Sequence, residues 1–366
     1  MRRRRLRLAV VLLVSILAVA GCAWMLVADP GASTTGASDA TATAAGAFFD
    51  RYLDADGRVV RRDQGGDTVS EGQSYALLLA AITDDRRRFD LVWSWTATHL
   101  QRPDGLLSWR YADGAVADPM SASDADLQAA WALSLAAQRF GSEPYASNGR
   151  TLAGAILDHE SVVAGGSRYV AAGPWATSDP AVVEPGYGAP TALIDLGHLT
   201  GDLRWNDVAA TSRRLGRELA DTSALPPDWV SVDLSSGRVE PVAAPDHSVD
   251  VPRYGLDAAR LVAWLAADCD SSSRATAGRW SATLSDHPLA QARDLSGAPS
   301  NGDESAASEA VVAVATRAAG DDAKSDSMLA EARRFDQDRP TYYGAAWVAL
   351  GYALVDAHSP LGCPSP

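Results

Sequence analysis

Apolar residues recur at helical spacing from residue 46 to near the end of the chain, in stretches that polar connections separate. This pattern predicts about twelve helices, near residues 44–53, 71–82, 86–101, 124–139, 146–159, 189–200, 205–221, 256–267, 274–285, 303–319, 325–335 and 341–356. Capping residues support several of the starts, such as Ser70 before Glu71 and Asp303 before the stretch at residues 305–319. We therefore expect an all-α protein.

Three of the connections are long, and they cover residues 102–121, 160–188 and 222–253. They carry the aromatic residues Trp109, Tyr111, Tyr169, Trp175, Tyr187 and Trp229. In the third connection, the alternating Val230, Val232 and Leu234 predict a short hairpin. Long loops in a compact domain are usually functional. We expect paired helices arranged around a ring, with these loops forming a groove at one end.

The first 28 residues differ from the rest of the chain. A flank of arginines precedes an uncharged apolar run at residues 8–28, which is long enough to span a bilayer as a helix. Within it, the string ending at Cys22 resembles the site at which a lipoprotein is cleaved and acylated. An uncleaved membrane anchor, a lipoprotein and a simple secretion signal all remain open. Each would place the following domain outside the cytoplasm.

Residues 29–45 are small, polar and low in complexity, which predicts a flexible tether. No shift toward Pro- or Gly-rich composition divides the remainder. We therefore predict a single domain at residues 46–366.

The chain carries a formal net charge of −14, and the arginine-rich leader masks part of the acidity of the domain. Such a domain repels nucleic acid and anionic lipid, so we expect no nucleic-acid partner and membrane contact only through the N-terminal segment. Neutral or cationic ligands, polysaccharides among them, remain open. The six histidines are scattered and no metal-binding motif is present, so no metal and no cofactor are expected. Cys269 and Cys363 could pair in an oxidising compartment, but one pair is weak support.

Three acidic stretches lie at predicted helix starts, and each has a plain structural explanation. Glu71 could simply cap its helix, as could Asp124 with Asp126, and Asp257 could form an ion pair with Arg260 three residues later. The alternative is catalytic. A general acid at position 71 would need burial or a neighbouring carboxylate to raise its pKa, whereas a base at position 257 would be kept ionised by its arginine neighbour.

Several strings, in order along the chain, resemble the motifs of glycoside hydrolase family 8, and the resemblance extends from about residue 47 to 356. The strings are SEGQSYA at 70–76, ASDADLQAAWALSLAAQRF at 122–140, EPGYGAP at 184–190, DLRWNDV at 202–208, LPPDWV at 225–230, LDAAR at 256–260 and PTYYGAAWVAL at 340–350. The first two together are specific. This family includes bacterial endoglucanases associated with cellulose synthesis, lichenases, chitosanases and some xylanases.

The resemblance implies an (α/α)6 barrel of six inner and six outer helices and hydrolysis with inversion of configuration. It places Glu71 on the proton donor, Asp257 on the proposed base, and Asp124 on the acid that holds the sugar at the cleavage point. Asp126 lies close by, Tyr187 falls on a tyrosine that helps to position the attacking water, and Arg260 on the partner of the base. The loop aromatics Trp109, Tyr111, Trp175 and Trp229 are candidate platforms for sugar rings.

The sequence also departs from the family pattern. Glu184 stands in place of an asparagine and Gly186 in place of a serine before Tyr187, while Ala76 replaces a glycine. None of these changes removes a proposed catalytic carboxylate. They leave the substrate preference and the role of Tyr187 open.

The first hypothesis is an inverting endo-β-1,4-glucanase that trims a polysaccharide at the cell surface, with the polysaccharide-synthesis machinery as a candidate partner. A chitosanase, lichenase or xylanase of the same family is an alternative. So is a non-catalytic polysaccharide-binding protein, although such a protein has no need of an acid–base pair. A polysaccharide lyase would need a Tyr, His or Lys base, and these motifs contain no His or Lys.

Overall fold

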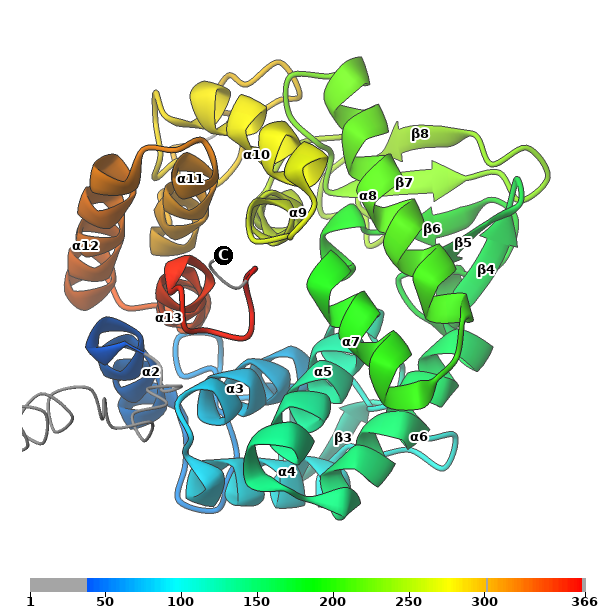
Figure 1. Ribbon diagram of the computed structural model, residues 1–366, viewed down its shortest axis with the longest axis vertical. Coiled ribbons are helices and arrows are strands. Elements are labelled where there is room, and N and C mark those ends of the chain that lie inside the picture. Colours follow the sequence, from blue (N-terminus) through cyan, green and yellow to red (C-terminus); the bar gives the residue numbers. More distant parts are fainter. Residues whose placement is uncertain (1–37, 301, 364–366) are drawn as a thin grey trace, which may run out of the picture. The chain divides into compact units, whose positions relative to one another are not determined.

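The computed structural model describes residues 38–300 and 302–363. In this part of the chain twelve helices form two concentric rings (Figure 1). The inner ring consists of α3 (Ser70–Ile82), α5 (Ser123–Phe140), α7 (Pro190–Thr200), α9 (Leu256–Ala266), α11 (Ala306–Ala318) and α13 (Tyr342–Val355). The outer ring consists of α2 (Asp39–Tyr52), α4 (Arg86–His99), α6 (Glu143–His159), α8 (Arg204–Thr222), α10 (Ser271–Leu284) and α12 (Asp322–Asp338). Each inner helix packs against the next, and α13 closes the ring against α3.

The two rings differ in sequence because they differ in what surrounds them. Every residue of α3 except Glu71 is buried, and α13 is apolar on nearly all sides. A helix that is apolar all round has to be enclosed by others. By contrast, α8 buries one face and exposes charged residues on the other. The predicted all-α ring of paired helices is confirmed, and all twelve predicted helices are present within a few residues.

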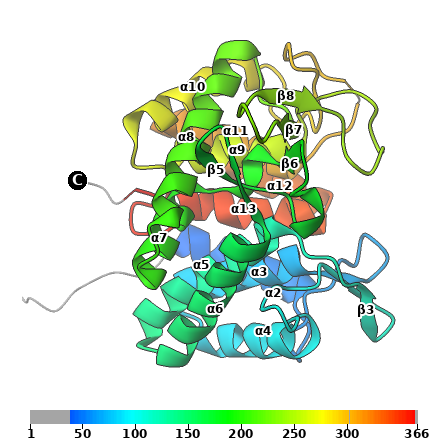
Figure 2. The ribbon, with the colours of Figure 1, turned by 90° about the vertical axis from the view of Figure 1, so that its right-hand side faces the viewer.

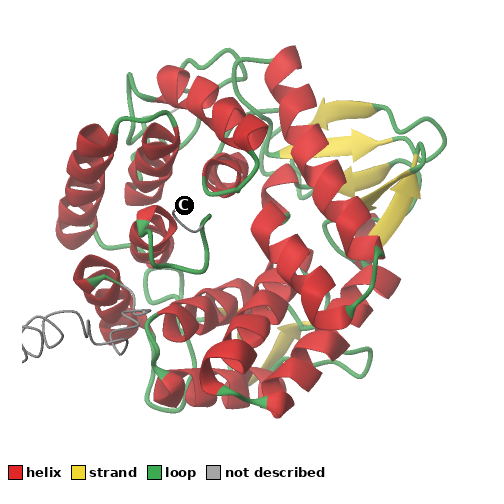
Figure 3. Ribbon diagram, viewed as in Figure 1, coloured by secondary structure: helices red, strands yellow, loops and turns green. Residues whose placement is uncertain are grey.

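The long connections contain short strands (Figure 3). They form three antiparallel groups: β1 (Thr68–Val69), β2 (Arg110–Ala112) and β3 (Ala115–Asp118); β4 (Ser161–Ala164) and β5 (Ser167–Val170); β6 (Ala181–Val183), β7 (Trp229–Val232) and β8 (Val239–Val242). The predicted hairpin is confirmed as β7–β8, in which Val230 and Val232 point into the core. The other strands, of two to four residues, are too short to leave a pattern in the sequence.

One predicted boundary was wrong. The tether was expected to continue to residue 45, but α2 begins at Asp39. The hydroxyl of Ser38 accepts from the backbone N–H of Thr41, and the backbone N–H of Ser38 donates to Asp356 at 2.7 Å. This capped start and its anchor on the end of α13 order a stretch whose composition is that of a linker.

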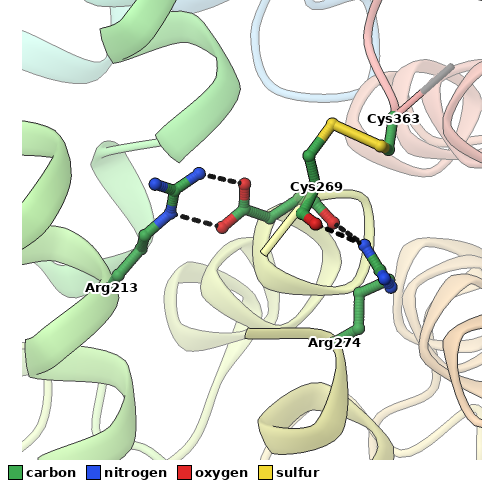
Figure 4. Close-up of a disulfide and its surroundings, with 5 residues drawn as sticks. Arg213, Cys269, Arg274 and Cys363 are labelled. Atoms are coloured by element: carbon green, nitrogen blue, oxygen red, sulfur yellow. Dashed lines mark hydrogen bonds and ion pairs between the residues drawn. A yellow bond between two sulfur atoms is a disulfide. The ribbon is translucent and has the colours of Figure 1, made fainter. Parts of the chain in front are cut away.

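A disulfide joins Cys269, just after α9, to Cys363 near the C-terminus (Figure 4). The neighbouring Asp268 accepts two hydrogen bonds from Arg213 on α8, at 2.6 and 2.7 Å. Arg274 donates to the carbonyl oxygens of Asp268 and Cys269, both at 2.8 Å. The disulfide attaches the C-terminal segment to the connection between α9 and α10, and the bonds from Arg213 tie that connection to α8.

Replacing both cysteines by serine is expected to lower the free energy of unfolding by about 2–4 kcal/mol. The crosslink spans 94 residues, and its loss gives the unfolded chain more conformational freedom. Urea unfolding of the oxidised wild type and of the double variant measures the effect, with the reduced wild type as control. Equal stabilities of all three would contradict a stabilising role for this crosslink.

Among the helices that the structure describes, none is long and apolar enough to cross a membrane. The predicted anchor at residues 8–28, with Cys22, lies outside the described residues.

Candidate active site

The predicted catalytic residues lie at one end of the barrel because of the way the inner helices run. An outer helix separates each inner helix from the next along the chain, so all six inner helices point the same way and begin at the same end. Glu71, Asp124 and Asp257 each lie in the first turn of an inner helix. The hairpin β7–β8 and strand β3 lie on the side of the barrel away from the carboxyl end of α13 (Figure 2).

Arg260 is the centre of this site. Its side chain is 2% exposed, and its two terminal nitrogens contact four carboxyl groups. Nη1 donates to Asp124 at 2.6 Å and to Glu71 at 3.2 Å. Nη2 donates to Glu184 at 2.7 Å and to Asp257 at 3.0 Å. One guanidinium therefore faces four carboxyl groups. Because a single positive charge cannot balance four negative ones, simultaneous ionisation of all four is disfavoured.

Exposure separates the four acids into two kinds. The side chains of Glu71 and Asp257 are 22% and 40% exposed, so both can reach a ligand or a water molecule. Those of Asp124 and Glu184 are 5% and 0% exposed and are directed at Arg260. Glu71 and Asp257 contact different nitrogens of the same guanidinium, so they are held apart. An inverting glycosidase needs about 6.5–9.5 Å between its two carboxyls to admit water.

The surroundings of Glu71 suit a proton donor. Burial raises its pKa to about 7, opposed by Arg260 and reinforced by the negative charge of Asp124. The hydroxyl of Tyr342, in the first turn of α13, donates to Glu71 at 3.1 Å. Gly72 makes this approach possible, because a Cβ there would lie 2.8 Å from the same hydroxyl. Glu71 can therefore hold its proton near neutral pH, as a general acid requires.

The capped first turn of α9 determines the position of Asp257. Burial raises its pKa above the ordinary value, and Arg260 opposes the rise. The carboxylate of Asp228 accepts from the backbone N–H groups of Gly255 and Ala258, at 2.7 and 2.9 Å, and so caps α9 from outside the helix. This cap fixes the turn that presents Asp257 to the cleft.

Two cavities adjoin the first turn of α9. One of about 490 Å³ is lined by Asp257 together with Trp109, Trp175 and Trp229. The other, of about 340 Å³, is lined by Leu256 and aromatic residues of α12 and α13. Three of the four predicted platforms are therefore brought together beside Asp257.

Tyr187 also lies in the site. It ends a 3-10 turn, η2 (Pro185–Tyr187), just before α7. The guanidinium of Arg260 lies over its ring, 4.8 Å from the centroid, and Trp229 packs against it edge-on. The structure therefore brings Tyr187 and Arg260 together with the acids, as predicted.

Two predicted ligand contacts are not brought into the cleft. Asp126 is fully buried, and its Oδ1 accepts from the backbone N–H of Leu107 at 2.9 Å. Burial raises the pKa of Asp126 well above its ordinary value and that of Glu160 to about 8, and the negative charge of Glu160 adds to the rise at Asp126. Tyr111 packs edge-on against Trp95 and His99 instead. Sequence spacing could not show that either side chain turns inward.

Glu184, Asp228 and Tyr342 contact the site but were not singled out as site residues. Each lies within a string that resembles a family motif, and that was the available signal. In the described part of the chain, no cluster of three or more His, Cys, Asp or Glu residues could hold a metal ion.

Comparison with known proteins shows the family of this chain. The sequence pattern of the glycosyl hydrolases family 8 matches residues 19–347. The chain belongs to glycosyl hydrolase family 8. A probable endoglucanase of Novacetimonas hansenii is 34% identical over 258 residues, which cover 68% of this chain and 72% of that protein. An endoglucanase of Cellulomonas uda is 28% identical over 254 residues, covering 66% and 67%.

A solved structure shows the same fold. The endo-β-1,4-glucanase CMCax of Acetobacter xylinum superposes with a TM-score of 0.71 at 27% identity, covering 86% of this chain and 97% of that one. Family 8 membership confirms the predicted (α/α)6 barrel and the prediction of a glycoside hydrolase. Family 8 enzymes are inverting hydrolases.

Proposed function

We propose that this family 8 enzyme is an inverting endo-β-1,4-glucanase with Glu71 as general acid and Asp257 as general base. One observation carries the assignment. Of the four carboxyls around Arg260, these two have the most exposed side chains, and they contact different nitrogens of the guanidinium. An acid and a base on separate sides of a sugar need such an arrangement.

In this mechanism Glu71 gives its proton to the glycosidic oxygen as the bond from the anomeric carbon to that oxygen breaks. Asp257 takes a proton from the water whose oxygen bonds to the anomeric carbon from the opposite face. The two carboxyls then return to their starting states by exchange with solvent. Asp124, held by Arg260, supplies negative charge beside the reacting ring, where an oxocarbenium-like transition state develops positive charge.

The substrate assignment rests on the relatives and on the cleft. The relatives that resemble this chain are endoglucanases, and the Acetobacter structure is an endo-β-1,4-glucanase. Trp109, Trp175 and Trp229 offer apolar faces for sugar rings in the larger cavity. A second cavity, lined by Leu256 of α9 and Tyr343 of α13, would give a longer polymer further room beside the site, which favours cutting within the chain.

The pH dependence of kcat/KM should be bell-shaped, with an acidic and an alkaline limb. The acid acts while protonated, so kcat/KM should fall as the pH rises through about 7, the pKa of Glu71. The base acts while ionised, so the rate should also fall as the pH drops through the raised pKa of Asp257. Initial rates on soluble β-glucan across this range measure both limbs. An alkaline limb near the ordinary pKa of a glutamate would contradict the assigned state of Glu71.

The function is tested with residues 38–366 on carboxymethyl-cellulose, mixed-linkage β-glucan, xylan and chitosan. The proposal expects reducing ends from the first two, with a rapid fall in viscosity that marks cutting within the chain. Cleavage of chitosan alone would favour the acidic cavity side chains Asp228 and Asp246 as ligands for a cationic sugar. Binding without any cleavage would favour a polysaccharide-binding protein.

We further propose that the domain acts outside the cytoplasm on a polysaccharide, attached through the N-terminal segment. The Cys269–Cys363 disulfide supports an oxidising compartment. Mass spectrometry of the mature protein would show an acylated Cys22, an intact anchor or a free processed end. An enzyme recovered only from the cytoplasm would contradict the proposal.

A further inference from the structure

Glu184 is a carboxylate in the active site that cannot act on a sugar directly. Its side chain is 0% exposed, and both of its oxygens accept from Nη2 of Arg260, at 2.7 and 2.8 Å. A group without access to the cleft cannot meet substrate or the attacking water. Its effect has to pass through Arg260.

The segment that carries Glu184 holds Arg260 from two sides. Glu184 contacts the edge of the guanidinium, and Tyr187, three residues later, lies against its face. Between them, Gly186 packs onto the backbone of α9: a Cβ there would lie 2.3 Å from the carbonyl oxygen of Asp257 and 3.1 Å from the Cβ of Arg260. Only glycine fits at this position, so residues 184–187 pack directly against the backbone of the first turn of α9.

Glu184 and Asp257 compete for the same nitrogen of Arg260. Nη2 lies closer to Glu184, at 2.7 Å, than to Asp257, at 3.0 Å. Nη1 serves Asp124 and Glu71, while Nε is buried without a hydrogen-bond partner. The hydrogen bonds that Nη2 donates to Glu184 therefore weaken its hydrogen bond to Asp257, the exposed base.

We propose that Glu184 is a positioning residue that holds the guanidinium of Arg260 and limits its electrostatic stabilisation of the base Asp257. The pH range in which the acid–base pair works therefore depends on Glu184. The inference rests on the proposed function, because it assumes that Asp257 and Glu71 are the base and the acid. Burial raises the pKa of Glu184 well above its ordinary value, and the contact with Arg260 opposes the rise. Both oxygens of Glu184 accept from the guanidinium, which is the geometry of an ionised carboxylate paired with an arginine.

Several charged groups face Glu184 from the packed elements, and any change at Glu184 acts through them. They are Asp124 on α5, Asp228 before β7, and Asp257 and Arg260 on α9. Three of the four are acids, so removing the charge of Glu184 makes ionisation of the remaining acids easier. It also leaves Arg260 free to move toward Asp257.

The test is the pH profile of Glu184→Gln beside the wild type, on whichever glucan the wild type cuts. Both limbs of kcat/KM should move to lower pH, by roughly 0.5–1 unit. A residue that only supports the fold would lower the rate or the stability without moving the limbs. Glu184→Asn should move them in the same direction and serves if the glutamine variant folds poorly.

Two controls isolate the charge. Glu184→Asp keeps the charge on a shorter side chain, so its limbs should stay at the wild-type pH even though the rate falls. Glu309→Gln removes another buried glutamate, on α11, outside the site, and should leave both limbs in place. Unmoved limbs in a folded, active Glu184→Gln enzyme would overturn the inference. A wild type that cuts no polysaccharide would instead overturn the proposed function.

Discussion

Replacing Glu71 by glutamine is expected to lower kcat/KM on β-1,4-glucan by about 10²–10⁴-fold, the contribution typical of a positioned general acid. Glutamine keeps the size of the side chain but has no proton to give to the leaving oxygen. The loss should depend on the leaving group. An aryl cellobioside with a strongly acidic phenol needs little protonation, so its cleavage should be far less affected than that of the polymer.

The matched control for this variant is Glu309→Gln. Glu309, like Glu71, lies in the first turn of an inner helix, and burial likewise raises its pKa to about 7. Its neighbour is Glu331 on the outer helix α12, not Arg260. If this control keeps near-wild-type activity while Glu71→Gln loses most of its activity, the loss results from the place of Glu71 in the active site and not from replacing a glutamate with a raised pKa. Equal losses in both variants, or full activity of Glu71→Gln on the polymer, would contradict the assignment.

Replacing Asp257 by asparagine is expected to cost a similar factor, about 10²–10⁴-fold, for a different reason. Asparagine cannot take the proton of the attacking water. Activation of the water is needed for every leaving group, so the loss should be as large on the activated aryl cellobioside as on the polymer. This contrast with Glu71→Gln assigns base and acid separately.

Structural damage has to be distinguished from loss of the base. Asp257 lies in the first turn of α9, whose cap comes from Asp228, so the asparagine variant should unfold at nearly the wild-type temperature. Binding of a cello-oligosaccharide should also persist. A variant that recovers activity on the aryl substrate would place the base elsewhere.

The helices were predictable because outer helices such as α8 alternate a buried face with a charged one, while inner helices such as α3 and α13 are long, nearly continuous apolar stretches. The three acids Glu71, Asp124 and Asp257 were predictable as a group, because motifs at helix starts meet at one end of such a barrel. Their clustering follows from the alternation of inner and outer helices along the chain. In a ring of this kind, Glu71, Asp124 and Asp257 therefore lie at the same end.

The contacts that organise the site were not predictable. Arg260 meets Glu184 across 76 positions and Glu71 across 189, and no local pattern records such pairs. The same holds for Tyr342, which reaches Glu71 across 271 positions. The family resemblance placed Asp126 close to the substrate, yet its side chain turns into the protein. Side-chain direction depends on tertiary packing, which one sequence does not specify.

The central claim is most directly tested by the configuration of the first product. Proton NMR of the wild type acting on a soluble cello-oligosaccharide follows the anomeric form of the newly released reducing end before it equilibrates in water. Inversion at a β-linkage through Glu71 and Asp257 predicts that the α-anomer appears first. First appearance of the β-anomer would show a covalent, retaining route and contradict the account.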